Sequence, residues 1–201
     1  MPEKLPRSFY QREDVVQIAR DLLGKQLVTE IGGVRTSAKI VETEAYKGST
    51  DRACHAFNYR KTKRTAVMFE PGGVAYVYLC YGIHHLFNII TNIEGEPDAV
   101  LIRAAEPLEG IEEMLARREM TELKARLTAG PGSLSKALGI RKEQTGVDLT
   151  DDQIWLEDYG ETISSELIIA SPRVGIDYAG EDAKLPWRFR VKENKWVSPA
   201  K

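Results

Sequence analysis

Residues 74–91 read VAYVYLCYGIHHLFNIIT, and this stretch decides how the chain folds. Residues 74–80 are rich in β-branched and aromatic side chains, which predicts a strand. Residues 84–91 predict a second strand that returns beside the first, and Tyr81-Gly82 predicts the tip of the resulting β-hairpin.

The tyrosines of this hairpin divide into two groups. Side chains on a strand alternate between faces, so Tyr76 and Tyr78 share one face, where a place in the core is the ordinary expectation for Tyr76. Tyr81 stands beside glycine at the tip and is not buried by its own hairpin. An exposed aromatic at a tip is typical of a contact surface, and insertion into a nucleic-acid stack is one role that it could serve.

The other elements follow from the spacing of apolar residues and from the positions of glycine and proline. The expected helices span residues 11–23, 108–127 and 130–138. The expected strands span residues 25–30, 35–46, 99–104, 154–157, 167–171 and 187–191, and residues 47–72 form a long polar loop. These elements predict an α+β fold: a single domain, residues 1–201, with a curved, mainly antiparallel β-sheet surrounded by helices and a protruding β-hairpin.

Composition is that of an ordinary globular protein, with 42% hydrophobic and 29% charged residues. The N-terminus lacks the apolar run of a signal peptide, and the most apolar stretch contains histidines and an asparagine, so no membrane association is expected. Cys54 and Cys80 are far apart and follow no metal-binding spacing. Free thiols of this kind favour the reducing cytoplasm.

Charge is unevenly distributed although the net charge is only −2. Residues 143–166 contain eight acids and no lysine or arginine, whereas residues 52–69 contain no acid. The cations of that second segment are Arg52, Arg60, Lys61, Lys63 and Arg64. Such a segment is either a solvated loop or a surface for a polyanion.

Two carboxylates lie on the strand that precedes this basic loop. Alternation places Glu42, Glu44 and Tyr46 on one face, with the two carboxylates roughly 6–7 Å apart. A solvated strand face is the usual explanation for such a pair. A carboxylate in a partly apolar cleft can instead deprotonate an attacking water, and the neighbouring basic loop and His55 favour that reading.

Two further polar residues have alternative explanations. His55 could bind a metal together with Glu42, Glu44 or Asp51, but no second histidine or cysteine stands at metal spacing, so no metal site is expected. Asn88 lies within an apolar strand, near the level of Tyr78 if the hairpin is tight. It is either a core amide with satisfied hydrogen bonds or a residue that reads the content of a pocket.

Several of these segments, in order along nearly the whole chain, resemble the alkyladenine (3-methyladenine) DNA glycosylase family. The matching segments are Glu42-Thr43-Glu44-Ala45-Tyr46, His55, residues 68–72, Tyr76-Val77-Tyr78 through Tyr81-Gly82 to Asn88, residues 101–110, residues 130–138 and residues 172–180. Departures are modest: Ile83 follows the tip where many relatives have Met, and Thr65 stands where many have Asn.

The resemblance implies a role for each matched residue. Glu44 would be the general base that activates water, and Tyr81 would fill the gap left in the duplex by a flipped nucleotide. The base pocket would have stacking walls of Tyr46, His55 and Tyr78 and a floor at Asn88 that discourages ordinary guanine. Arg103 would hold the DNA backbone or a water near the scissile sugar. Apart from the resemblance, the charge of the basic segment makes Arg60, Lys61, Lys63 and Arg64 candidates for contacts with the backbone.

The expected function is therefore that of a monofunctional DNA glycosylase that flips alkylated or deaminated purines from duplex DNA and starts base excision repair. No lysine stands beside Glu44 to form a Schiff base, and no cofactor is expected. The partner would be double-stranded DNA containing damaged purines, bound by a cytoplasmic monomer associated with the nucleoid. Two alternatives stay open: a metal-dependent nucleic-acid hydrolase using Glu42, Glu44, Asp51 and His55, and a nucleic-acid-binding module without catalysis.

Overall fold

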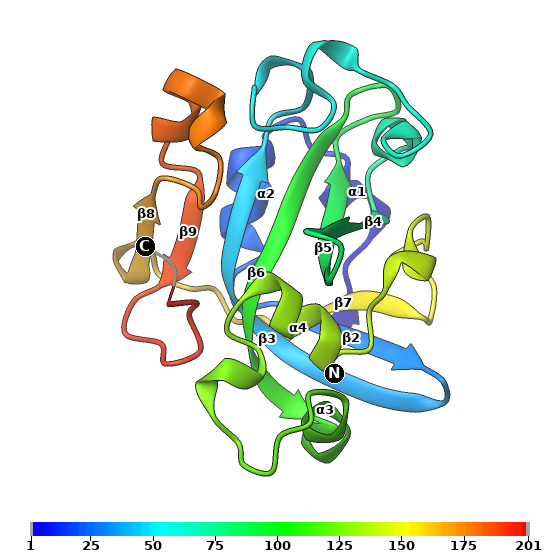
Figure 1. Ribbon diagram of the computed structural model, residues 1–201, viewed down its shortest axis with the longest axis vertical. Coiled ribbons are helices and arrows are strands. Elements are labelled where there is room, and N and C mark those ends of the chain that lie inside the picture. The colour runs from blue at the N-terminus through cyan, green and yellow to red at the C-terminus, as the bar shows by residue number, and fades with distance from the viewer. Residues whose placement is uncertain (1, 200–201) are drawn as a thin grey trace.

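A computed structural model describes residues 2–199 and shows one α+β domain built around a curled antiparallel sheet (Figure 1). The strand order is β1-β7-β2-β3-β6-β5-β4, and a β8–β9 hairpin joins the sheet where β9 pairs with β3. The strands are β1 Glu3–Lys4, β2 Gln26–Ile31, β3 Val34–Tyr46, β4 Val74–Cys80, β5 His84–Thr91, β6 Asp98–Glu109, β7 Ile154–Asp158, β8 Ile168–Ser171 and β9 Arg188–Val191. The predicted fold class is confirmed.

Helices cover both faces of the sheet. They are α1 Arg7–Tyr10, α2 Val15–Asp21, α3 Ile111–Arg117 and α4 Pro131–Ala137. The hydroxyl of Thr43 in β3 donates to the carbonyl of Ala19 in α2, 2.8 Å away, so this side of β3 faces α2. Alternation turns Glu42 and Glu44 to the opposite side. The two carboxylates are therefore directed away from α2.

The pairing of β3 with β6 shifts register at three places, and two of these shifts adjoin Glu42. Ile40 pairs with Ala105 and Glu42 with Ala104, which leaves Val41 without an opposite residue on β6. Thr43 then pairs with Ile102, so Arg103 is the extra residue on β6. A bulge changes the direction of a side chain and increases the local twist of a strand. This irregularity lies where Arg103 meets the acidic face of β3.

The β4–β5 hairpin has the predicted strand boundaries. Cys80 pairs with His84, so a three-residue loop connects the strands, and Asn88 pairs with Tyr76 rather than lying level with Tyr78. Tyr81 and Gly82 both have left-handed backbones, with φ of 50° and 74°. This conformation costs a tyrosine energy that a glycine does not pay, since Cβ approaches the backbone.

The predicted helix over residues 108–127 is wrong at both ends. β6 continues to Glu109, which pairs with Ser37, because the long β3 offers a partner beyond Ala104. The helix starts only after Gly110, whose φ is 72° and where a Cβ would lie 2.6 Å from the Arg35 carbonyl oxygen. It ends at Arg117, and Glu119 has a left-handed φ of 54° that breaks the helical path.

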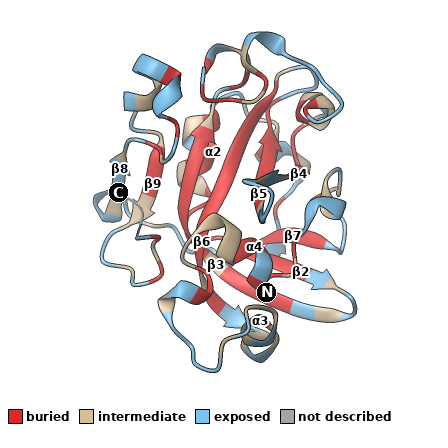
Figure 2. Cartoon of the chain, in the orientation of Figure 1, coloured by how far each residue is buried: buried red, intermediate tan, exposed pale blue. Residues whose placement is uncertain are grey.

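Buried residues concentrate on the central strands, as Figure 2 shows in red. The largest hydrophobic cluster joins α2 to the sheet through residues such as Ile18, Leu22, Val41 and Ala45. A smaller cluster lies beneath the loop of residues 47–72 and includes Cys54, Met68 and Tyr76. Among the described residues, no helix is long and apolar enough to cross a membrane.

Candidate active site

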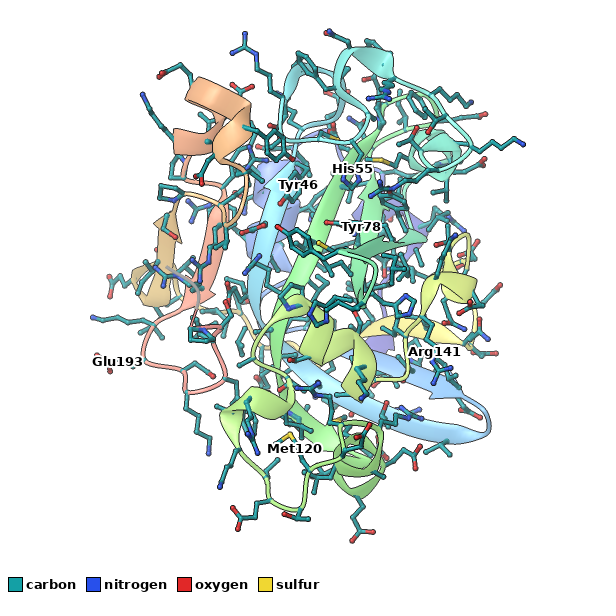
Figure 3. The ribbon with its side chains drawn as sticks, in the orientation of Figure 1. Tyr46, His55, Tyr78, Met120, Arg141 and Glu193 are labelled. Atoms are coloured by element: carbon teal, nitrogen blue, oxygen red, sulfur yellow. The ribbon has the colours of Figure 1, made fainter. Side chains whose placement is uncertain are left out.

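A cavity of about 650 Å³ opens between the β4–β5 hairpin, the loop after β3, the start of α4 and residues 174–178. We call it the aromatic pocket, because its lining includes Tyr46, Tyr76, Tyr78 and His55. Figure 3 shows Tyr46, His55 and Tyr78 gathered around one space, although they come from β3, the following loop and β4. The fold thus brings together three residues that the family resemblance placed in one pocket.

His55 and the tyrosines of β4 form one wall of the aromatic pocket. The His55 ring meets Tyr78 edge-on at 4.7 Å between centroids, and Tyr76 lies 5.6 Å from Tyr78. His55 Nδ1 is 3.0 Å from the Tyr76 hydroxyl. Burial, and secondarily the charge of Arg64, lowers the pKa of His55 to about 4. The imidazole is therefore neutral near pH 7 and presents an uncharged surface to the pocket.

Tyr46 forms the opposite wall and connects the pocket to the acid behind it. Its hydroxyl donates to Glu44 Oε2 at 2.8 Å, and the guanidinium of Arg173 lies 4.7 Å from the centre of its ring. Burial, with the charge of Glu44 adding to it, raises the pKa of Tyr46 well above its ordinary value. The phenol therefore stays protonated and continues to donate to the carboxylate.

Glu44 is fully buried directly behind the pocket wall. Its Oε1 accepts from the backbone N–H of Val174 at 2.9 Å and lies 3.3 Å from Arg103 Nη1. Glu44 does not itself line the aromatic pocket, but its three partners Tyr46, Arg103 and Val174 do. The carboxylate is one hydrogen bond from the cavity surface and is not directed to bulk solvent.

Glu42 is also fully buried and has a different set of partners. Its Oε1 accepts from Arg103 Nε at 2.8 Å, Arg188 Nε at 2.7 Å and the Ser198 hydroxyl at 2.9 Å. The backbone N–H of Ser198 donates to Oε2 at 2.6 Å. Glu42 is therefore occupied by structural hydrogen bonds, and Arg103 connects it to Glu44.

The residues of the metal-site alternative do not gather around one point. Asp51 is buried and its two oxygens are held by the guanidinium of Arg173, with Nη2 2.9 Å from Oδ1. His55 bonds Tyr76 instead of a carboxylate. In the described part of the chain no group of three or more His, Cys, Asp or Glu side chains is placed to hold a metal ion.

Asn88 is buried at the floor of the aromatic pocket, with 4% of its surface exposed. Its amide nitrogen donates to the carbonyls of Tyr76 and Leu86, both at 3.2 Å. These bonds fix the orientation of the amide and leave its oxygen as the acceptor on the remaining side. Asn88 therefore has satisfied core bonds and also lies in the lining of the aromatic pocket, and its part in reading the content of that pocket stays a prediction.

Exposed apolar side chains mark the rim of the aromatic pocket. Tyr81 is 90% exposed and its neighbour Ile83 is 71% exposed, while Tyr178 at the opposite rim is 71% exposed. Tyr81 and Tyr178 both belong to the pocket lining. The predicted position of Tyr81, projecting from a hairpin tip, is the position that the structure gives it.

The basic loop lies beside the same rim. Arg60, Lys61, Lys63 and Arg64 are exposed. The guanidinium of Arg64 lies 5.1 Å from the centre of the Tyr78 ring and 3.4 Å from His55 Nε2, so this arginine belongs to the pocket wall as well as to the surface. Arg103 differs from the other predicted backbone contacts, because it is only 5% exposed and its guanidinium is bound to two carboxylates.

Sequence reasoning gave no role to Arg173, Val174 or Ser198. Arg173 supports Tyr46 from behind and fixes Asp51, Val174 donates to Glu44, and Ser198 donates to Glu42. Residues 172–180 were among the segments quoted for the family resemblance, and that was the one available signal for Arg173 and Val174. Ser198 had no signal, since its contribution is partly a backbone N–H.

An aromatic pocket beside a buried carboxylate, with an exposed aromatic and a basic loop at its rim, defines an enzyme that acts on a planar group in a polyanion. Residues 8–195 match the family described as methylpurine-DNA glycosylase (MPG). The chain belongs to this family, whose members are hydrolases of N-glycosyl bonds in DNA.

Individual relatives agree over nearly the whole chain. A protein named "Putative 3-methyladenine DNA glycosylase" from Chlamydia felis is 47% identical, covering 96% of this chain and 100% of its own. Proteins of the same name from Clostridium acetobutylicum and Bacillus anthracis are 47% and 49% identical, with at least 96% of this chain covered and 98% of each relative.

Proposed function

We propose that this chain flips alkylated or deaminated purines out of duplex DNA into the aromatic pocket and hydrolyses the N-glycosidic bond with a water activated by Glu44. The observation that carries the proposal is the arrangement of Tyr46, with its ring on the pocket and its hydroxyl on Glu44 Oε2 at 2.8 Å. A base held against this ring would have its sugar near the buried acid.

Recognition would begin with the purine ring of the damaged base. Alkylation of adenine at N3 or N7 makes the base cationic, and a cation over a tyrosine face gains about 0.5–2 kcal/mol. Tyr46 and Tyr78 supply such faces. Asn88 would present its amide oxygen from the floor and leave no room for the exocyclic amine of ordinary guanine. Damaged bases also cost less to unstack, which adds to selectivity.

Extrusion of the nucleotide leaves a gap in the duplex that Tyr81 would fill. Tyr81 is 90% exposed at the hairpin tip and therefore has little intramolecular packing to lose. Stacking on an aromatic side chain is worth about 1–3 kcal/mol per base, which offsets part of the few kcal/mol that extrusion costs. The exposed cations of residues 60–64 would hold the backbone beside it.

Hydrolysis replaces the bond from C1′ to the base nitrogen with a bond from C1′ to a water oxygen. The base leaves with the electron pair, so a cationic alkylpurine departs neutral and needs no proton. Glu44 would accept the water proton and stabilise the positive charge that develops on the sugar. No lysine is among the described contacts of Glu44, which supports a mechanism without a Schiff base and without strand cleavage.

Glu44→Gln tests this role. The amide keeps the shape of the side chain but cannot accept the proton, so release of 3-methyladenine from methylated duplex should fall at least a hundredfold, whereas binding to a duplex with an abasic analogue is retained. Chromatography of the released base and fluorescence anisotropy measure the two quantities. Turnover within tenfold of wild type would remove Glu44 from the mechanism.

The same assay separates the alternatives. Full base release by the wild type in EDTA opposes a metal-dependent hydrolase. Binding of duplex without any release of free base would instead identify a nucleic-acid-binding module. Duplexes carrying 3-methyladenine, 7-methylguanine, hypoxanthine or ethenoadenine, assayed side by side, would define the substrate range.

A further inference from the structure

A second cavity adjoins the aromatic pocket near the tip of the β4–β5 hairpin, where Ile83, His84 and His85 line it, and we call it the basic groove. It has a volume of about 620 Å³, and His84 and Gly132 line both cavities. A Cβ at Gly132 would lie 3.0 Å from the His84 ring, so α4 and the hairpin meet closely here. The basic groove therefore continues the surface from which Tyr81 projects.

The charge of the basic groove is mainly positive. Of the described residues that line it, Arg117, Arg118, Lys136 and Arg141 are cations and only Glu143 is an acid. Arg117 and Lys136 are paired with acids elsewhere, at 2.9 Å and 3.1 Å. The ion pairs found among residues 2–199 include none with Arg118 or Arg141. Arg118 and Arg141 therefore have no ion-pair partner among the described residues, although the charge of Glu119 acts on Arg118 and partly offsets the lowering of its pKa.

Arg118 lies in surroundings that favour an added anion. Its Nη2 donates to the Arg126 carbonyl at 3.2 Å and to the Ser133 hydroxyl at 3.0 Å, and both acceptors are neutral. Its Nε is buried, with no hydrogen-bond partner among the described residues. Burial, with the nearby charge of Arg126, lowers the pKa of Arg118. A phosphate in the basic groove would offset the repulsion between these cations.

A third cavity, lined by Lys63, Arg64 and Lys142 together with Tyr78 and Leu79, adjoins the hairpin where the basic loop reaches it. In Figure 3, His55 and Arg141 lie on opposite sides of Tyr78. Cations thus lie on both of these sides of the hairpin, and Lys142 approaches Lys63 and Arg64 along β4. A duplex entered by a wedge at its minor groove has a phosphodiester backbone on either side of that wedge.

We propose that the basic groove binds the DNA backbone on the side of Tyr81 away from residues 60–64. The exposed side chains of Arg141 and Lys136 contact phosphates. Arg118, which lines the basic groove, attracts the backbone by its positive charge. This proposal rests on the proposed function, because the duplex is positioned by the insertion of Tyr81. The basic groove increases the affinity for DNA and fixes the position of the protein along the duplex. It has no part in base selection, since phosphate contacts carry no base information.

The test is the salt dependence of binding to an undamaged, fluorescently labelled duplex, followed by anisotropy. Arg141→Ala and Lys136→Ala should each reduce the slope of log K against log salt by about 0.9, and the double variant by about 1.8. Glu143→Gln should tighten binding, since it removes the one acid of the groove. Lys192→Ala is the matched control, because this exposed lysine adjoins Glu193, far from Arg141 in Figure 3.

Slopes for both alanine variants equal to those of wild type and Lys192→Ala would overturn the basic groove as a backbone site. Thermal unfolding of each variant shows that it is folded. Failure of the proposed function has a separate signature: wild-type protein that releases no base from methylated DNA. In that case the slopes of log K against log salt still show whether the basic groove binds the DNA backbone.

Discussion

Arg103 Nη1 lies 3.3 Å from Glu44 Oε1, and both side chains are buried. The same guanidinium donates from Nε to Glu42, so one arginine connects two fully buried carboxylates. Arg103 has this position because it is the extra residue of the bulge in β6. The position of the proposed catalytic acid therefore depends on a backbone irregularity and on a second acid that does not reach the pocket.

Glu42→Gln should lower both stability and turnover. Loss of one partner from a buried ion pair costs about 3–5 kcal/mol, because Arg103 and Arg188 are left less well compensated. Urea unfolding measures that loss. Arg103 would also hold Glu44 less firmly, so base release under single-turnover conditions should fall while the affinity for abasic duplex stays close to that of wild type.

Ser198→Ala is the matched control for Glu42. It removes the hydroxyl bond of 2.9 Å but keeps the backbone bond of 2.6 Å to the same carboxylate. The expected loss is about 1 kcal/mol with turnover little changed. Equal turnover in Glu42→Gln and wild type would show that Arg103 holds Glu44 without help from Glu42.

His55 should give stability a dependence on pH between about 4 and 6.5. Its pKa is lowered in the folded protein to about 4, so the unfolded chain binds more protons within that window. The contribution is fully present above pH 6.5 and is lost as pH falls toward 4. NMR of the imidazole nitrogens should show a neutral ring at pH 6. Arg64→Ala should raise the pKa of His55, and an unchanged value would assign the whole shift to burial.

Tyr81→Asn should separate duplex activity from single-strand activity. Asparagine tolerates the left-handed backbone at this position, where φ is 50°, so the turn is kept and only the ring is lost. Base release from duplex should fall at least tenfold, whereas release from a single strand, which needs no wedge, should stay within twofold. Parallel losses on both substrates would contradict the role of the ring in flipping.

The Asp51–Arg173 pair should be essential for stability. The two side chains are fully buried, and Asp51→Asn would leave the guanidinium without its counter-charge, at a cost of about 3–5 kcal/mol in urea unfolding. The double variant Asp51→Asn/Arg173→Met should recover part of that loss, because no unpaired charge remains. A single variant as stable as wild type would show that water or another group replaces the carboxylate.

The hairpin and its flanking strands could be predicted from sequence because their patterns are local. Alternating aromatics and β-branched residues determine β4 and β5, and period-two spacing correctly places Glu42 and Glu44 on one face. The helix over residues 108–127 was predicted too long: α3 spans Ile111–Arg117 and ends before Glu119, while Leu108 and Glu109 extend β6. Tertiary pairing with β3 overrides local propensity there.

The side chains that line the pocket could be predicted, but the groups that hold Glu42 and Glu44 in place could not. Tyr46, Tyr78 and His55 line one pocket as expected, and family resemblance was needed to join them. The burial of Arg103 could not be predicted, because it results from a one-residue change of register between β3 and β6. Val174 and Ser198 donate backbone N–H groups to Glu44 and Glu42, and nearly every residue type has such a group, so their identity could not indicate these bonds.

The hydrogen bonds from Ser198 to Glu42 have a consequence for synthesis of the protein. Glu42 and Glu44 leave the ribosome before their partners Val174, Arg188 and Ser198, which follow more than a hundred residues later. The nascent chain carries these two acids without those partners until residue 198 has been added. A chain that stops before Val174 would contain the residues of the β4–β5 hairpin but none of the three groups that fix Glu42 and Glu44 from the later part of the sequence.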